Sequence, residues 1–373
     1  MAAHVSVFQV HGGSLWTDIK HKPRRCIFPR KLKHKQRMSC RGLSLRIMAA
    51  ATGLDGPEDT SLRPVKDHRP SLWANISFSF DNQVHIERCA EDVEALKEEV
   101  RSMVMAIDSK PKDKMILIDT LERLGVAYHF EQEIEDQIEQ IFKFHVEDDN
   151  DLFTTALHFR LFRQHGYDVP SSIFNNFKDK DNKFKKTLIG DIEGLLSLYE
   201  ASYLRYANED ILEEALIFTT QYLDEARSKL DSYLQEKVTH ALKQPIHRGV
   251  TIVEARYYIS IYEKKESKNE VLLRLAKLNF KLLQNLYQKE LDDLLKWWKE
   301  VNLTSKLPYL RDSMVESYFW GLAIHFEPQY SSSRLAVAKA ILFTVVVNDT
   351  YDSYATFEEI QLFVDTLQRY APL

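Results

Sequence analysis

Residues 270–300 read EVLLRLAKLNFKLLQNLYQKELDDLLKWWKE, and this stretch decides the fold. It is rich in Leu, Lys, Glu and Gln, which favour helices, and its apolar residues recur with a period near 3.6. Neither Gly nor Pro interrupts it. We predict one long amphipathic helix that ends at Trp297–Trp298.

The rest of the chain has the same character. Only six of the 11 glycines lie in the 317 residues after position 56, too few for a phosphate-binding glycine loop or a turn-rich β fold. The sequence therefore predicts an all-α protein, whose short polar breaks favour antiparallel helix pairs, as in a barrel of helices. Further helices are expected at 82–107, 112–125, 131–144, 150–165, 170–176, 184–201, 207–221, 225–242, 250–262, 309–324 and 334–347.

Charge is unevenly distributed along the chain. Residues 1–47 contain 11 Lys and Arg and one acid, Asp18, which leaves −15 on the remainder of a chain whose net charge is −5. Such a basic leader resembles an organelle transit peptide, but Met48 also looks like a natural start, and both interpretations stay open. No folded nucleic-acid-binding module accompanies the basic residues, which argues against a nucleic-acid partner.

The cysteines and the hydropathy of the chain indicate its redox compartment and whether it is expected to cross a membrane. Cys26, Cys40 and Cys89 have no metal-binding spacing and form no disulfide framework, as expected in a reducing compartment. No apolar run reaches about 18 residues, so no transmembrane helix is expected.

Residues 338–352, AKAILFTVVVNDTYD, join an apolar segment to clustered oxygen ligands. In a helix, Asn348, Asp349 and Asp352 are close enough in register to share one face. Mg²⁺ prefers one or two carboxylates, several waters and phosphate oxygens. The pattern indicates a Mg²⁺ site that holds an ionised group beside a buried apolar tail. The alternative interpretation is a solvated acidic turn.

Several longer stretches point to one family. They are RPSLW (69–73), LIDTLERLG (117–125) followed by YHF (128–130), TALHFRLFRQHGYDVP (155–170), GLLSLYEAS (194–202), LAKLNF (275–280), VESYFW (315–320) and FEPQY (326–330). Together they resemble plant terpene synthases, most closely the sesquiterpene synthases of flowering plants. The resemblance runs from about Arg63 to the last residue.

The resemblance implies three regions. Residues 1–62 would be a basic leader and arm, 63–265 an N-terminal α-barrel domain, and 266–373 the N-terminal part of a class I metal-binding catalytic α-domain. Because the last region would be incomplete, we expect it to expose apolar helix faces.

The resemblance also implies a lyase. Mg²⁺, with Mn²⁺ as an alternative, would assist the loss of diphosphate from farnesyl diphosphate, and the carbocation would cyclise in an aromatic-lined pocket to a sesquiterpene. We expect a monomer in the cytoplasm that binds a prenyl diphosphate and neither nucleic acid nor membrane. A plastid is the alternative location if residues 1–47 are a transit peptide.

Carried over by position, the metal ligands are Asn348, Asp349 and Asp352 of a DDxxD-like motif. Asn348 stands where the family has its first aspartate, which removes one charge and should weaken Mg²⁺ binding. Asp349 and Asp352 match the second and last aspartates, and the resemblance also assigns them to substrate binding.

Two further residues are candidates for catalysis and substrate binding, Arg311 and Trp320. Arg311 matches the first arginine of an Arg-x-Arg pair that binds diphosphate. Ser313 stands where the family has the second arginine, so one set of charge-assisted hydrogen bonds to diphosphate is lost. Trp320 matches an aromatic residue of the pocket wall, and an ordinary core tryptophan is the alternative. Arg69 and Trp73 match an arm that covers the mouth of the active site.

The family's second metal motif lies well over a hundred residues beyond the first and would fall after Leu373. We therefore expect this chain as it stands to be inactive, although its family is enzymatic. The alternative is a non-catalytic remnant that acts, if at all, as a helical binding or interaction domain.

Overall fold

The computed structural model describes residues 68, 71–73, 78, 83–106, 110–144 and 151–370. The predicted leader, with Cys26 and Cys40, lies outside the described residues, as does Arg69 of the predicted arm. All described residues belong to one compact unit.

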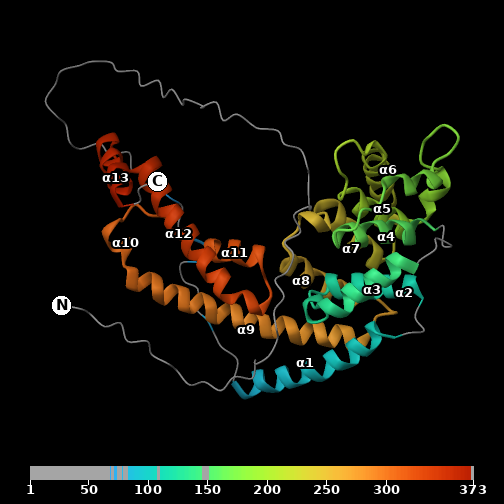
Figure 1. The fold of residues 1–373 in the computed structure, drawn as a ribbon, viewed down its shortest axis with the longest axis horizontal. Helices are drawn as coiled ribbons and strands as arrows, with labels where there is room; N and C mark the ends of the chain where they lie inside the picture. The colour runs from blue at the N-terminus through green and yellow to red at the C-terminus, as the bar shows by residue number, and fades with distance from the viewer. Residues whose placement is uncertain are drawn as a thin grey trace, which may run out of the picture. The chain divides into compact units, whose positions relative to one another are not determined.

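The described residues form helices and no β-strand, which confirms the all-α prediction (Figure 1). The first group consists of α1 (Gln83–Val104), α2 (Pro111–Arg123), η1 (Ala127–His129), α3 (Glu131–Phe144), α4 (Leu152–Gln164), η2 (Ser171–Phe177), η3 (Lys186–Gly190), α5 (Ile192–Ser202), α6 (Asp210–Ala226), η4 (Arg227–Lys229), α7 (Ser232–Lys243), η5 (Ile246–Arg248) and α8 (Thr251–Tyr262). The second consists of α9 (Glu270–Val301), α10 (Leu303–Lys306), α11 (Met314–Ile324), η6 (Pro328–Tyr330), α12 (Ser331–Ser353) and α13 (Phe357–Tyr370).

Three predicted helices differ from the observed ones for local reasons. The segment 170–176 forms the short 3₁₀-helix η2 instead of an α-helix. The helix predicted at 184–201 starts only at α5, because the Asp191 side chain accepts the Gly194 N–H at 2.9 Å and caps it. Asp231 delays the start of α7 in the same way, by accepting the Leu234 N–H at 3.0 Å.

Helix α9 is the long helix predicted at 270–300. The Asn269 side chain caps its first turn, and Asn302 ends it in the left-handed conformation, with φ of 52°. Helix α9 packs against α1 and α12, as Figure 1 also shows. Its first half contributes to one hydrophobic core and its second half, through Leu291 and Leu294, to another. A domain boundary at 265/266 stays a prediction.

The first core gathers side chains from α1–α9, and α4 and α5 lie deepest in it. Every residue from 194 to 202 is buried, so α5 is covered on all sides by its neighbours. Such a helix is amphipathic only weakly, and its apolar character all round is typical of a central helix.

Four charged side chains form a closed ring inside this core. Arg123 donates to Asp119 Oδ2 at 2.8 Å and to Glu200 Oε1 at 3.0 Å. Arg160, 1 % exposed, completes the ring through ion pairs with the same two carboxylates. Although burial acts to raise them, the two arginines hold the pKa values of Asp119 and Glu200 below their ordinary range. The ring therefore stays ionised and ties α2, α4 and α5 together.

The free energy of unfolding is expected to fall as the pH drops from 6.5 to about 4. Burial lowers the pKa of His129 and of His247 from 6.5 to about 4. In that interval the unfolded chain binds more protons than the folded one. Stability that is fully present above pH 6.5 is therefore lost as the pH falls, by up to about 1.4 kcal/mol per pKa unit for each histidine.

Urea unfolding at about pH 7.5 and about pH 5 measures this loss. The double variant His129→Gln, His247→Gln should show a smaller difference between the two pH values than the original chain. The exposed His85, changed to Gln, serves as the control and should leave the difference unchanged. An undiminished pH effect in the double variant would contradict the assignment.

Candidate functional site

The three predicted metal ligands lie in the last turns of α12, which extends to Ser353, beyond the predicted end at 347. Asn348 and Asp352, four residues apart, are exposed, whereas Asp349 is turned inward and only 1 % exposed. The structure thus brings the side chains of Asn348 and Asp352 to one open side of the helix and separates Asp349 from them. Their roles as metal ligands stay predictions.

Arg311 holds the buried Asp349 carboxylate. The backbone N–H of Arg311 donates to Oδ2 at 3.1 Å, and the guanidinium Nη2 lies 2.8 Å from Oδ1. The pairing compensates a charge that would otherwise be costly to bury. Since the Arg311 side chain is 39 % exposed, part of the guanidinium is still open to a ligand.

Residues 307–313 form a loop that docks on the end of α12. The Tyr309 hydroxyl lies 3.0 Å from Thr350 Oγ1, and its ring stacks on Tyr354 with centroids 3.9 Å apart. This docking explains why α11 begins at Met314 and not at the predicted residue 309. It also places Arg311 over Asp349.

Ser313 occupies the position at which the resemblance predicts a second arginine. It precedes α11 as the N-cap residue, but its side chain makes no capping hydrogen bond. Within the described part of the chain, the buried Ser313 Oγ has no hydrogen-bond partner. The loop therefore presents one guanidinium, that of Arg311.

A buried ion pair under the site links α9 to α12. Arg334 forms two parallel hydrogen bonds with Glu290, at 2.9 and 2.6 Å, and its remaining Nη1 donates to the carbonyls of Glu327 and His325. Tyr318 of α11 donates to the same Glu290 carboxylate at 2.7 Å. Burial opposes the charge of Arg334, yet Glu290 raises its pKa above the ordinary value. This clamp fixes α9, α11 and α12 against one another.

Gly321 allows α11 to approach α12 closely. A Cβ atom at Gly321 would lie 2.8 Å from the carbonyl oxygen of Arg334, closer than atoms in proteins tolerate. The glycine is therefore required where the two helices cross above the clamp.

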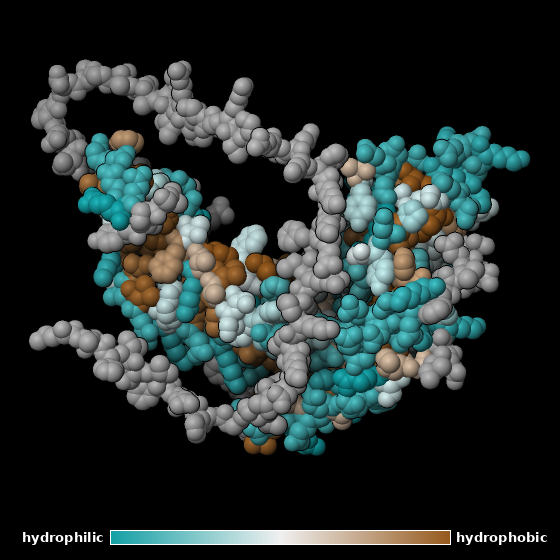
Figure 2. Space-filling model, viewed as in Figure 1, coloured by the Kyte–Doolittle hydropathy of each residue, from teal (hydrophilic) through white to brown (hydrophobic). Residues whose placement is uncertain are grey.

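Helices α11 and α12 also share an apolar face that is open to solvent in the described structure. Figure 2 shows hydrophobic residues gathered over this part of the chain. Trp320 is 63 % exposed, so it is not an ordinary core tryptophan of the described residues, and its role in a pocket wall stays a prediction. The expected exposure of apolar helix faces in 266–373 is confirmed. The face consists of Phe319, Trp320, Ile324, Phe343 and Val347.

The segment Pro328–Ser353 is long and apolar enough to cross a membrane by length and composition, with a mean hydropathy of 1.4. The sequence predicted no such segment, because polar residues interrupt every apolar run before about 18 residues. The mean hydropathy of the segment stays high, because a few polar residues change an average only slightly. One such helix is weak evidence, since core helices of soluble proteins pass the same test.

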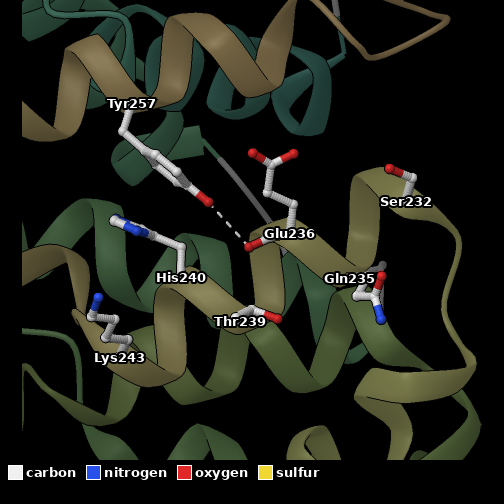
Figure 3. Close-up of a pocket in the computed structure, with 7 residues that line it drawn as sticks. All are labelled: Ser232, Gln235, Glu236, Thr239, His240, Lys243 and Tyr257. Atoms are coloured by element: carbon white, nitrogen blue, oxygen red, sulfur yellow. Dashed lines mark hydrogen bonds between the residues drawn. The ribbon is translucent and has the colours of Figure 1, made fainter.

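A polar groove of about 410 Å³ lies along α7, far in sequence from the predicted site (Figure 3). His240 lies 2.7 Å from Glu254 and stacks on Tyr257 with ring centroids 3.6 Å apart. The Tyr257 hydroxyl donates to the backbone carbonyl of Glu236 at 3.1 Å. His240 and Glu254 thus bond to each other within the groove. No sequence motif predicted this groove.

The described residues contain no group of three or more His, Cys, Asp or Glu side chains that could hold a metal ion. The set at the end of α12 consists instead of one exposed carboxylate, Asp352, and the amide oxygen of Asn348. Oxygen ligands of this kind suit Mg²⁺, which keeps several waters and shares ligands with a phosphate. The residues therefore fit a weak, ligand-assisted Mg²⁺ site.

Sequence reasoning missed Tyr309, His68 and the Glu290–Arg334 pair. His68 lies 4.0 Å from Asp349 although the two are far apart in the chain. Glu290 and Arg334 lie within predicted amphipathic helices, and their charges were the available signal. Nothing in the sequence indicates that these two residues pair with each other. Tyr309 carried no signal either, because it was predicted to start the helix 309–324 and not to lie in a loop.

The chain matches two families, described as "Terpene synthase, N-terminal domain" over residues 72–242 and "Terpene synthase family, metal binding domain" over residues 299–372. Among curated relatives, a (+)-delta-cadinene synthase isozyme of Gossypium arboreum is 45 % identical over 323 residues, which cover 87 % of this chain and 58 % of that protein. The gamma-curcumene synthase of Pogostemon cablin is 52 % identical over 295 residues, which cover 78 % of this chain and 54 % of that protein.

Among solved structures, isoprene synthase from grey poplar leaves (Populus x canescens), in complex with three Mg²⁺ ions and dimethylallyl-S-thiolodiphosphate, is similar with a TM-score of 0.74. Its sequence is 38 % identical, and the similarity covers 77 % of this chain and 55 % of that one. The chain thus spans a little more than half the length of these three relatives. The two matched families together account for more than half of its residues, and the chain belongs to the plant terpene synthase family, with sesquiterpene synthases among its relatives.

Proposed function

We propose that this chain carries the diphosphate-binding part of a sesquiterpene synthase site for farnesyl diphosphate. One observation supports this most directly. The exposed oxygens of Asn348 and Asp352 lie on the turns of α12 that also bear the Arg311–Asp349 pair, and the apolar face continues from there along α12. A polar end beside an apolar wall suits an amphipathic prenyl diphosphate.

Each residue then has a distinct task. Asp352 and Asn348 would hold Mg²⁺, which when bound neutralises the charge that develops on the leaving diphosphate. The open part of the Arg311 guanidinium binds diphosphate oxygens, and Asp349 orients that guanidinium. Trp320 presents an aromatic face to the allylic cation.

The relatives support this proposal by the products in their names and by the ligands of one solved structure. The cotton and Pogostemon proteins are named for sesquiterpene products, and the poplar structure holds Mg²⁺ and a diphosphate analogue. These properties belong to those proteins. For this chain they favour a prenyl diphosphate over other ligand classes.

The charge of the site favours weak binding and little turnover by the chain as it stands. Asn348 is neutral, Asp349 is already paired with Arg311, and Ser313 brings no second guanidinium. Of the three predicted ligands on α12, only Asp352 adds an exposed negative charge for a cation. A helical binding domain without turnover is therefore the second candidate function, and we expect no detectable terpene from farnesyl diphosphate and Mg²⁺.

The affinity for Mg²⁺ with inorganic diphosphate tests the site without requiring turnover. Asn348→Asp should tighten binding about tenfold or more, because a charged contact contributes on the order of 1.5–3 kcal/mol. Asp352→Asn should weaken it by a similar factor. Titration calorimetry of the full chain measures both changes.

Asp365→Asn on α13 is the matched control, since it removes one partly buried carboxylate that is not a candidate ligand. It should leave the affinity unchanged. The proposed site is wrong if Asp352→Asn and Asp365→Asn have the same effect on diphosphate binding.

A further inference from the structure

Two buried polar atoms face each other at the site without a hydrogen bond. His68 Nε2 and Asp349 Oδ1 lie 4.0 Å apart, and the side chains are 19 % and 1 % exposed. Within the described residues neither atom has a hydrogen-bond partner. A buried donor or acceptor that stays unpaired is costly, so such atoms are expected to find partners.

The contacts of Asp349 show which of its two carboxylate oxygens lacks a hydrogen-bond donor. Oδ2 already accepts the backbone N–H of Arg311 at 3.1 Å. Oδ1 lies 2.8 Å from the Arg311 Nη2, an ion-pair distance, but without the alignment of a hydrogen bond. An ionised carboxylate can accept several hydrogen bonds, and Oδ1 is the acceptor that lacks one.

We propose that His68 is a positioning residue of the site, which donates its Nε2–H to Asp349 Oδ1, the oxygen that also pairs with the Arg311 guanidinium. The neutral imidazole with its proton on Nε2 is sufficient, so no change of charge is involved. A movement of about 1 Å brings the two atoms into hydrogen-bond range. His68 and Arg311 then both hold the carboxylate.

This contact couples residue 68 to the diphosphate-binding loop. Asp349 is the partner of both the backbone and the side chain of Arg311, so a carboxylate held by His68 keeps the loop 307–313 in place. The orientation of Arg311 toward diphosphate rests on the proposed function. The contact between His68 and Asp349 does not.

The Arg311 amide is a direct reporter, because its N–H donates to the same carboxylate. The full chain is labelled with ¹⁵N-arginine, and hydrogen exchange of the Arg311 amide is measured. The variant His68→Phe keeps a ring but removes the hydrogen-bond donor. Its Arg311 amide should exchange about two- to tenfold faster than in the original chain. His68→Gln restores a side-chain N–H and should exchange at nearly the original rate. Leu72→Ala, at an exposed position close by in sequence, is the control and should have no effect.

Unchanged exchange in His68→Phe would overturn the proposal. Equal acceleration in His68→Phe and His68→Gln would also overturn it, since ring packing and not the hydrogen bond would then be responsible. Diphosphate titration of the same variants separates this question from the proposed function. If the original chain binds no diphosphate, the proposed function fails, while amide exchange still decides the contact.

Discussion

Arg334→Ala is expected to lower the free energy of unfolding by about 3–5 kcal/mol, the usual cost of leaving one partner of a buried ion pair alone. Arg334 is 1 % exposed and donates to the Glu290 carboxylate and to two backbone carbonyls. Its loss leaves the buried Glu290 charged, with the Tyr318 hydroxyl as its remaining hydrogen-bond donor among the described residues. Since the clamp joins α9, α11 and α12, the variant should also lose the binding of Mg²⁺ and diphosphate.

Urea unfolding followed by tryptophan fluorescence suits this measurement, because Trp297, Trp298 and Trp320 lie on α9 and α11. The exposed Arg369→Ala on α13 is the control and should cost less than about 1 kcal/mol.

The double variant Arg334→Met, Glu290→Leu separates burial of an unpaired charge from loss of packing. It removes both charges and should be more stable than Arg334→Ala. A double variant that is less stable than Arg334→Ala would show that the ion pair itself, and not the orphaned carboxylate, sets the cost.

The second large effect is expected in the first core. Arg160→Met should lower the free energy of unfolding by about 3–5 kcal/mol, because Asp119 and Glu200 would each lose one of their two guanidinium partners. The pKa of both carboxylates should rise toward the ordinary range. Their stabilising effect, present above an unfolded pKa near 4 and lost as the pH falls, should then disappear at a higher pH.

Acid titration of the folded fraction measures this change, and its midpoint should move to higher pH in Arg160→Met. Arg256 on α8 is exposed, donates to Ser260 and lies over the Phe280 ring, so Arg256→Ala should move neither the stability nor the acid midpoint appreciably. If Arg160→Met behaves like Arg256→Ala, the ring contributes nothing to the fold of this domain.

These two predictions concern different cores that α9 connects. Its first half packs with the ring-containing core and its second half carries Glu290. Variants in the first core therefore test the scaffold, whereas variants of the clamp test the support of the candidate site. Diphosphate binding should respond more strongly to Arg334→Ala than to Arg160→Met.

The sequence by itself determined the helical class and most of the helices. The 3.6-residue period of 270–300 predicts α9, and the scarcity of glycine excludes a β fold. Such features are local, because they depend on residues within a few turns of one another. The polar residues Asn348, Asp349 and Asp352 at the end of an apolar helix could be recognised for the same reason.

Only the tertiary structure decided how the site is arranged. Asp349 turns inward because Arg311, 38 positions earlier, binds it, while Asn348 and Asp352 stay exposed. His68 reaches the same carboxylate from the start of the body of the chain. Pairings between residues distant in sequence depend on how helices pack, and no periodicity encodes them. For that reason the ligand types could be predicted from the sequence, but their partners, their burial and the remaining charge of the site could not.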